Sequence, residues 1–139
     1  TVGNHTLNHL SGCATENITY FHNIRHCARM VNSGLFRPPY GKLKPSQAQF
    51  LQRHYRIIMW DVLSGDFDRD IRPEDCAQNV IQHAEAGSIV VFHDSLKAKA
   101  NLEYALPRVL EHLTEMGYVF RALPAMLPAV AEGKLKVAV

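Results

Sequence analysis

Apolar runs of strand length alternate along the chain with stretches of helical periodicity. Helices are predicted at residues 17–33, 44–54, 73–86 and 101–116. Strands are predicted at residues 35–37, 56–63, 88–92 and 118–123. No hairpin signal separates any two strands, so this alternation predicts β-α units with a parallel sheet. The expected fold class is therefore α/β.

Two of these segments have patterns that predict which side chains are buried. The first helix carries an apolar stripe, formed by Ile18, Phe21, Ile24, Ala28 and Val31. His22 and His26 lie off this stripe beside two arginines and are interpreted as solvated. The run at 56–63 is almost continuously apolar, which is typical of a strand buried on both faces. Pro107 predicts a late start or a kink in the last helix.

Length and composition are those of a globular domain. The 139 residues can bury one core, and 47% hydrophobic with 20% charged residues is typical of a folded protein. A net charge of +2 is too small to indicate nucleic acid or an anionic membrane surface as partner. No apolar run approaches the ~18 residues of a membrane span, and no signal peptide is visible. Cys13, Cys27 and Cys76 are odd in number and scattered, which predicts buried or partly buried thiols.

Two histidines stand four residues apart at the beginning of the sequence. His5 and His9 follow a Gly3-Asn4 turn, and a helix starting there would place both imidazoles on one face. Two imidazoles so placed can bind one divalent metal ion. No glutamate lies between them, so the H-E-x-x-H motif of zinc peptidases is not matched. Pairs with this spacing also occur on solvated helix faces, and both interpretations stay open.

Three polar side chains follow the carboxyl ends of predicted strands: Arg37, Asp66 and His93. Active sites of β-α barrels and open α/β sheets are built at this edge. An imidazole can protonate a leaving nitrogen, a carboxylate can hold that imidazole, and an arginine can orient a carboxylate. With a metal at the histidine pair, these groups predict metal-assisted hydrolysis of an amide or ester. A purely structural role is the alternative, because a third metal ligand and a carboxylate base are not identified.

Four short motifs occur in the order found in one known family. Residues 5–9 match H-[ST]-x-x-H in full, and residues 37–40 match R-x-P-[YW]. Residues 63–67 match D-x-x-D-W in part, and residues 91–93 match L-x-H with a conservative change. With these motifs the chain resembles the NodB-type polysaccharide deacetylases of carbohydrate esterase family 4.

The resemblance implies a metal site near the N-terminal motif. His5 and His9 would be metal ligands, with zinc as the expected ion and cobalt, nickel or iron as alternatives. Metal-bound water would be the nucleophile. Arg37 would position the catalytic base, and the backbone N–H of Tyr40 would help to stabilise the oxyanion.

The two later motifs imply an acid and a pocket. His93 would be the general acid, and Asp66 would tune it. Phe67, in place of the motif's tryptophan, and Val91, in place of its leucine, would line the acyl or sugar pocket. Leu63 stands where the motif has its first aspartate.

The resemblance also implies a partial domain. Residues 1–123 would be the C-terminal portion of a NodB homology domain with a distorted (β/α) barrel, and 124–139 an apolar tail of unknown role. Nothing in the chain matches the family's first motif, T-F-D-D-G-P, which supplies the base and the third metal ligand. A partial barrel leaves unpaired sheet edges, so we expect a missing N-terminal segment or an oligomeric partner to cover the core.

The expected function is the removal of N-acetyl, or O-acetyl, groups from a polysaccharide. The alternative is a non-catalytic remnant that binds carbohydrate or metal without turnover, because the base and third ligand are not found. A nucleic-acid or protein-interaction module has little support, since no basic stripe or aromatic platform appears. Peptidoglycan, chitin and xylan remain open as substrates. A periplasmic, secreted or other cell-envelope location follows only from the family.

Overall fold

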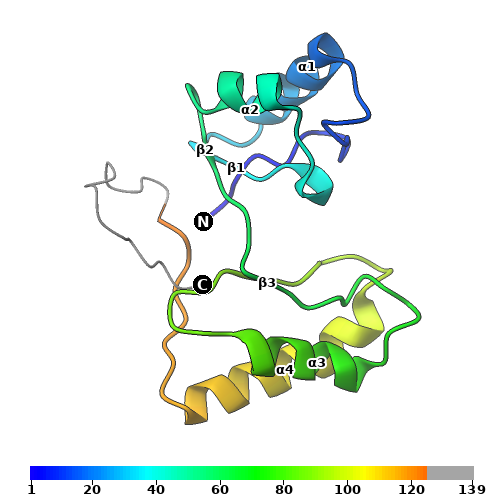
Figure 1. Cartoon of the computed structure of the whole chain (residues 1–139), viewed down its shortest axis with the longest axis vertical. Helices are drawn as coiled ribbons and strands as arrows, with labels where there is room; N and C mark the ends of the chain where they lie inside the picture. The colour runs from blue at the N-terminus through cyan, green and yellow to red at the C-terminus, as the bar shows by residue number, and fades with distance from the viewer. Residues whose placement is uncertain (125–139) are drawn as a thin grey trace. The chain divides into compact units, whose positions relative to one another are not determined.

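The computed structural model describes residues 1–124, so the expected tail at 124–139 lies almost wholly outside the described residues. The described chain divides into two compact units. Unit 1 comprises residues 1–59 with Pro124, and unit 2 comprises residues 60–123. In Figure 1 unit 1 runs from blue to green and unit 2 from green to orange. The treatment of residues 1–123 as one domain portion stays a prediction.

Unit 1 is built on a two-stranded parallel sheet. Its elements are α1 (Asn17–Ala28), β1 (Leu35–Phe36), the 3-10 helix η1 (Pro39–Gly41), α2 (Pro45–Leu51) and β2 (Arg56–Ile57). Strands β1 and β2 pair in parallel, with Leu35 opposite Arg56. On the other edge of β1, the Asn4 N–H donates to the Leu35 carbonyl at 2.8 Å and the Arg37 N–H donates to the Asn4 carbonyl at 3.0 Å. This pairing fixes the backbone immediately before His5 beside the main strand of the unit.

The core of unit 1 is a cluster of large side chains from both helices and β1. It contains Tyr20, Ile24, Phe36 and Leu51. Helix α1 therefore buries the face marked by Tyr20, Ile24 and Cys27. The predicted stripe was wrong in part, because Ile18 is 75% exposed. The prediction left out Tyr20, which is fully buried and belongs to the same cluster as Phe36.

The apolar run at 56–63 is not one strand, which corrects the sequence prediction. It divides into β2 and β3 (Val62–Leu63), which belong to two different sheets. Between them, the Arg37 guanidinium donates to the carbonyls of Ile58 and Met59, at 3.2 Å each. These carbonyls have a side-chain donor in place of a neighbouring strand. An apolar run predicts burial, but it does not determine which partner each backbone group finds.

Unit 2 also combines two helices with a two-stranded parallel sheet. Its elements are β3, α3 (Pro73–His83), β4 (Val90–Val91) and α4 (Lys99–Glu115). Strands β3 and β4 pair in parallel, with Val62 opposite Val90. The two helices pack against each other over a core formed by Val62, Cys76, Ala77, Val80, Ala105, Val109 and Leu113. Pro107 lies inside α4, which begins at Lys99, so the late start that was one of the two predictions for this proline is wrong.

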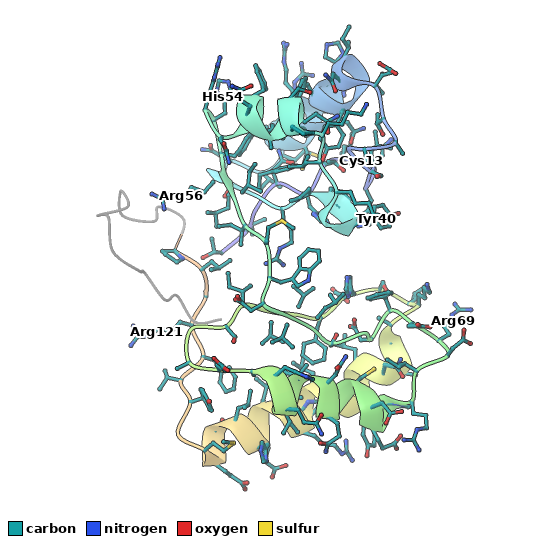
Figure 2. The ribbon with its side chains drawn as sticks, in the orientation of Figure 1. Cys13, Tyr40, His54, Arg56, Arg69 and Arg121 are labelled. Atoms are coloured by element: carbon teal, nitrogen blue, oxygen red, sulfur yellow. The ribbon has the colours of Figure 1, made fainter. Side chains whose placement is uncertain are left out.

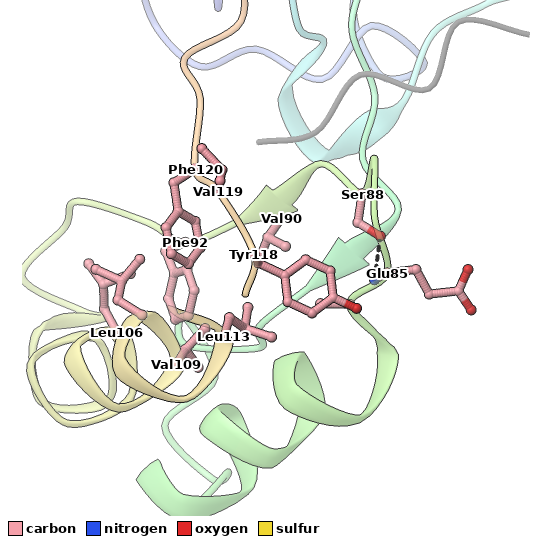
Figure 3. A pocket seen from close by; sticks show the side chains of 12 residues that line it. Glu85, Ser88, Val90, Phe92, Leu106, Val109, Leu113, Tyr118, Val119 and Phe120 are labelled. Carbon is pink, nitrogen blue, oxygen red and sulfur yellow. Dashed lines mark hydrogen bonds between the residues drawn. The ribbon is translucent and has the colours of Figure 1, made fainter. Parts of the chain in front are cut away.

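The predicted strand at 118–123 is not formed in the described structure. Gly117, at φ 85°, ends α4, and the Tyr118 N–H donates back to the Leu113 carbonyl at 2.9 Å. This is a Schellman turn, in which the residue after the glycine packs against the last helical turn. The following apolar side chains, with Val90 and Phe92, therefore line a hollow beside α4 (Figure 3).

Parallel strands alternating with helices agree with the predicted α/β class. The thiols of Cys27 and Cys76 are buried as expected, whereas Cys13 is exposed. Burial raises the pKa of the Cys76 thiol, because a thiolate is poorly solvated there. Covering of the sheet edges by a further segment or an oligomeric partner stays a prediction.

Candidate active site

The residues from Asn4 to Leu10, here called the histidine loop, do not form a helix. Thr6 and His9 have positive φ angles of 62° and 54°. The prediction that a helix places His5 and His9 on one face was therefore wrong. The loop nevertheless brings the rings of His5 and His9 together, with centroids 4.9 Å apart and planes 70° apart.

Side-chain oxygens hold the histidine loop in this shape. Asn4 is buried, and its Oδ1 accepts from the Thr6 N–H at 3.0 Å. Asn23 of α1 accepts from the N–H groups of Leu7 and Asn8, at 2.8 and 3.0 Å. The hydroxyl oxygen of Thr6 accepts from the Leu10 N–H at 3.1 Å. Left-handed backbone costs roughly 1–2 kcal/mol per residue outside glycine, and these bonds offset that cost.

The two imidazoles fit a divalent metal in their donor chemistry. His5 Nδ1 lies 2.6 Å from the Arg37 carbonyl oxygen. A carbonyl only accepts, so Nδ1 donates and the lone pair of the ring is on Nε2, as in histidines that bind metals. His9 also meets the ring of Tyr40, at a centroid distance of 4.8 Å. Within residues 1–124, no group of three histidine, cysteine or acidic residues is placed to hold a metal.

Arg37 and Tyr40 lie on either side of a double proline that stiffens their loop. The guanidinium of Arg37 is bound to the two carbonyls after β2, and partial burial lowers its pKa below the usual value of an arginine. Tyr40 has a φ of 59° and is 62% exposed, and its side chain extends from η1 into solvent (Figure 2). Their roles toward a base and an oxyanion stay predictions.

Asp66 and His93 form a bidentate pair in unit 2. Asp66 is completely buried. Its Oδ1 accepts from His93 Nδ1 at 2.7 Å, and its Oδ2 accepts from the His93 backbone N–H at 2.6 Å. The side chain of His93 is 37% exposed. The imidazole is therefore fixed through Nδ1, while the ring still reaches solvent.

An aromatic ring borders this pair. Phe67 meets the His93 ring edge-on, with centroids 5.0 Å apart. The ammonium of Lys97 lies 5.9 Å from the centre of the Phe67 ring. Val91 is buried on β4, two residues before His93. The contact of Phe67 with His93 is compatible with a pocket wall, while the pocket roles of Phe67 and Val91 stay predictions.

The second histidine pair on α1 behaves as interpreted. His22 and His26 are exposed, and with Arg25 and Arg29 they line a small polar hollow on the helix surface. No carboxylate or thiol joins them among the described residues. Histidine spacing alone does not distinguish this pair from His5 and His9, whereas the loop around His5 does.

Several polar residues that hold the site were missed from the sequence. They are Asn4, Asn23, Ser64 and Asn101. Asn4 had a usable signal, because an asparagine directly after a glycine often bonds the backbone two residues on. Asn23 and Asn101 contact residues far away in the sequence, and Ser64 makes a single long hydrogen bond, so no local pattern indicates these three residues.

The chain is similar in sequence and in fold to known proteins. No protein-family model matches the chain. A peptidoglycan-N-acetylglucosamine deacetylase of Bacillus cereus is 25% identical over 133 residues, which are 91% of this chain and 62% of the relative. A crystal structure of a peptidoglycan N-acetylglucosamine deacetylase superposes with a TM-score of 0.81 at 23% identity. The resemblance to family 4 deacetylases is confirmed.

Other solved structures extend the comparison. PdaC, a peptidoglycan deacetylase of Bacillus subtilis, gives a TM-score of 0.69 at 24% identity over 84% of this chain and 58% of its own. A family 4 pseudoenzyme from Bacillus anthracis gives 0.68 at 23% identity, over 84% of this chain and 42% of its own. These structural likenesses show a shared fold. The chain spans 62% of the Bacillus cereus relative and 64% of the structure that superposes at 0.81.

Proposed function

We propose that this chain is part of a metal-dependent polysaccharide deacetylase, a hydrolase that removes N-acetyl groups, or O-acetyl groups, from a glycan. Its fold would be part of a distorted (β/α) barrel. A divalent metal bound by His5 and His9, for which zinc is our choice, would polarise the acetyl carbonyl and lower the pKa of a water molecule.

In this proposal His93 donates a proton to the leaving nitrogen of the sugar. Its Nδ1 is bound to Asp66, so the proton passes from Nε2. Asp66 holds the ring through Nδ1 and holds the backbone of His93 through its N–H. Phe67 restricts the ring from one side. Val91 would contribute to the wall of the acyl or sugar pocket.

The residues around the metal have supporting roles in the proposal. The Arg37 carbonyl orients His5 through a hydrogen bond. The Arg37 guanidinium would position the catalytic base, which the described residues do not identify. The Tyr40 N–H would bind the oxyanion.

The observation that carries the proposal is the bidentate pair of Asp66 and His93. A fully buried carboxylate that fixes a partly exposed imidazole is an arrangement suited to proton transfer. A histidine that only supports the fold would not require a ring that reaches solvent. The acetylated glycan of the relatives then suggests the substrate class, with peptidoglycan as the first choice.

Acetate release from an acetylated chito-oligosaccharide in the presence of zinc tests the proposal. His93→Ala should lower the turnover by about 10²–10⁴-fold, as expected for a general acid. His83→Ala is the matched control, because His83 is exposed in the same unit and bonds only its own helix, at Asn79. A chelator should abolish the activity of the unmodified chain. Equal activity of both variants would contradict the role of His93.

The second candidate function is a binding remnant without turnover. It is favoured by one observation, namely that the described residues supply two metal-type histidines but no third ligand. The similar structure of a family 4 pseudoenzyme gives this candidate a precedent. Zinc binding without release of acetate would select it.

Action at the cell envelope is also a proposal. It rests on the peptidoglycan substrate named for the relatives. Among the helices of residues 1–124, none has the length and apolar character needed to cross a bilayer. A pull-down of the intact chain with peptidoglycan would test whether the chain binds this polymer of the cell envelope.

A further inference from the structure

Each group of candidate residues sits on a loop that an asparagine from a helix holds. Asn23 of α1 contacts the histidine loop, and Asn101 of α4 contacts the loop that begins at Asp66. Neither asparagine belongs to a matched motif. We propose that Asn23 and Asn101 are positioning residues, Asn23 for metal binding by the histidine loop and Asn101 for the Asp66–His93 pair.

Asn23 acts through two adjacent backbone groups. Its Oδ1 accepts from the N–H groups of Leu7 and Asn8, at 2.8 and 3.0 Å. These residues lie between His5 and His9, and the loop there contains two left-handed residues. Without the acceptor, both N–H groups turn to water and the backbone relaxes toward ordinary φ angles. The ring pair would then separate.

Asn101 acts in the opposite sense, as a donor. It is 7% exposed and lies in the first turn of α4. Its Nδ2 donates to the carbonyls of Asp66 and Asp68, at 3.2 and 2.9 Å. The backbone that presents the Asp66 carboxylate is therefore tied to the helix. Loss of this donor would free that backbone and loosen the two bonds to His93.

Asn23 uses its side-chain amide as an acceptor and Asn101 uses its amide as a donor. The same substitution by aspartate should therefore have opposite effects at the two positions. An asparagine-to-aspartate substitution keeps Oδ1 as an acceptor but removes the Nδ2 donor. Asn23→Asp should therefore retain the bonds to the histidine loop. Asn101→Asp should lose its bonds and also place a carboxylate against two carbonyl oxygens. A role in general stability would not produce this reversal.

Zinc titration of the intact chain measures the role of Asn23. Asn23→Ala should weaken the affinity about 10–100-fold, the usual effect of residues that support metal ligands. Asn23→Asp should restore it. Asn32→Ala is the matched control, since Asn32 is exposed just beyond the same helix. Failure of Asn23→Asp to restore binding, or an unchanged affinity in Asn23→Ala, would overturn the inference for this residue.

The hydrogen-bonded Nδ1 proton of His93, observed by NMR, measures the role of Asn101. Asn101→Ala and Asn101→Asp should both broaden this signal through exchange with water. Methyl signals of Val109 and Leu113, which are buried on the same helix, report whether each variant is folded. If Asn101→Asp does not fold, Asn101→Ala decides. A sharp His93 signal in folded Asn101→Ala would contradict the inference.

The functional meaning of both residues rests on the proposed function, but the two can fail separately. Exchange of the Leu7 and Asn8 amides needs neither zinc nor turnover. It should be slow in the unmodified chain and in Asn23→Asp, and fast in Asn23→Ala. Absence of zinc binding in the unmodified chain would refute the metal site, whereas uniform amide exchange in all three proteins would refute the positioning role.

Discussion

His5 in unit 1 and His93 in unit 2 are held through the same ring atom by different acceptors. The Nδ1 of His5 donates to a backbone carbonyl, which is neutral, whereas the Nδ1 of His93 donates to a buried carboxylate. Both arrangements leave Nε2 as the atom that meets a ligand. A neutral acceptor suits an imidazole that gives its lone pair to a metal, and a carboxylate suits one that moves a proton. The two histidines therefore differ in the charge of the group that fixes Nδ1, a difference that residue type alone does not show.

The largest expected effect comes from neutralising one acceptor. Asp66→Asn should lower acetate release by about 10²–10⁴-fold, because it replaces one of the two carboxylate oxygens that accept from His93 with an NH₂ donor. Zinc affinity should stay unchanged, since the histidine loop is not altered. Asp68→Asn, in the same loop but exposed, is the control. A parallel loss of zinc binding in Asp66→Asn would break the distinction between the two histidines.

The next effect tests the support of the histidine loop by the core of unit 1. Phe36 is fully buried in β1, and Phe36→Ala should lower the free energy of unfolding by about 3–5 kcal/mol. Zinc affinity should fall with it, because β1 pairs with Asn4 and leads directly into Arg37, whose carbonyl accepts from His5. Phe50 is 43% exposed, and Phe50→Ala should cost much less in urea unfolding. Equal losses in the two variants would contradict the described core.

A smaller effect is expected at Tyr20. Its buried hydroxyl has no hydrogen-bond partner among the described residues, whereas the buried carboxylate of Asp66 has two. Burial, together with the nearby Cys13 thiolate, raises the pKa of Tyr20 from 10.0 to about 12. The folded chain thus holds this proton more tightly than the unfolded chain.

Stability from Tyr20 is accordingly present below pH 10.0 and lost as the pH rises to about 12, by roughly 2–3 kcal/mol. Tyr20→Phe should flatten this part of the curve of unfolding free energy against pH. Tyr40→Phe, at an exposed tyrosine of the same unit, should leave the slope as it is. A slope that survives in Tyr20→Phe would show that other groups cause it.

The smallest effect concerns an exposed ion pair. Arg72 and Asp75 are joined at 2.8 Å, with side chains 74% and 46% exposed. Hydrogen bonding to Arg72 lowers the pKa of Asp75, so any stability from this pair is present at neutral pH and lost on acidification. Arg72→Gln should leave the midpoint of unfolding unchanged within error, because solvent screens the pair. A clear drop in the midpoint would mean that this exposed ion pair stabilises the fold as much as the buried pair of Asp66 and His93 does.

Local signals predicted the starts of α1, α2 and α3 well, whereas α1 ends at Ala28 and not at residue 33 as predicted. Pro45 and Pro73 begin α2 and α3, and Gly117 ends the last helix, as their backbone preferences require. The strands were predicted as apolar runs, but their pairing depends on distant partners. The run at 56–63 divides because Arg37 takes two of its carbonyls, and nothing local to that run indicates it.

In the candidate site, too, some features could be predicted from neighbouring residues in the sequence and others depend on contacts with distant residues. The motif residues His5, His9 and His93 are visible in the sequence by type and spacing. The helix expected to pair the first two is absent, and oxygens from Asn4 and Asn23 shape the loop instead. Asn23 lies on another element, so its role follows only from the fold.

The central claim is that the histidines divide into metal ligands and a proton donor. Long-range ¹H–¹⁵N NMR spectra of the histidine side chains, recorded while zinc is added to the intact chain, test it most directly. The account predicts that the Nε2 signals of His5 and His9 move together and that those of His93 and His22 do not. Movement of His93 with zinc, or no movement of His5 and His9, would contradict it.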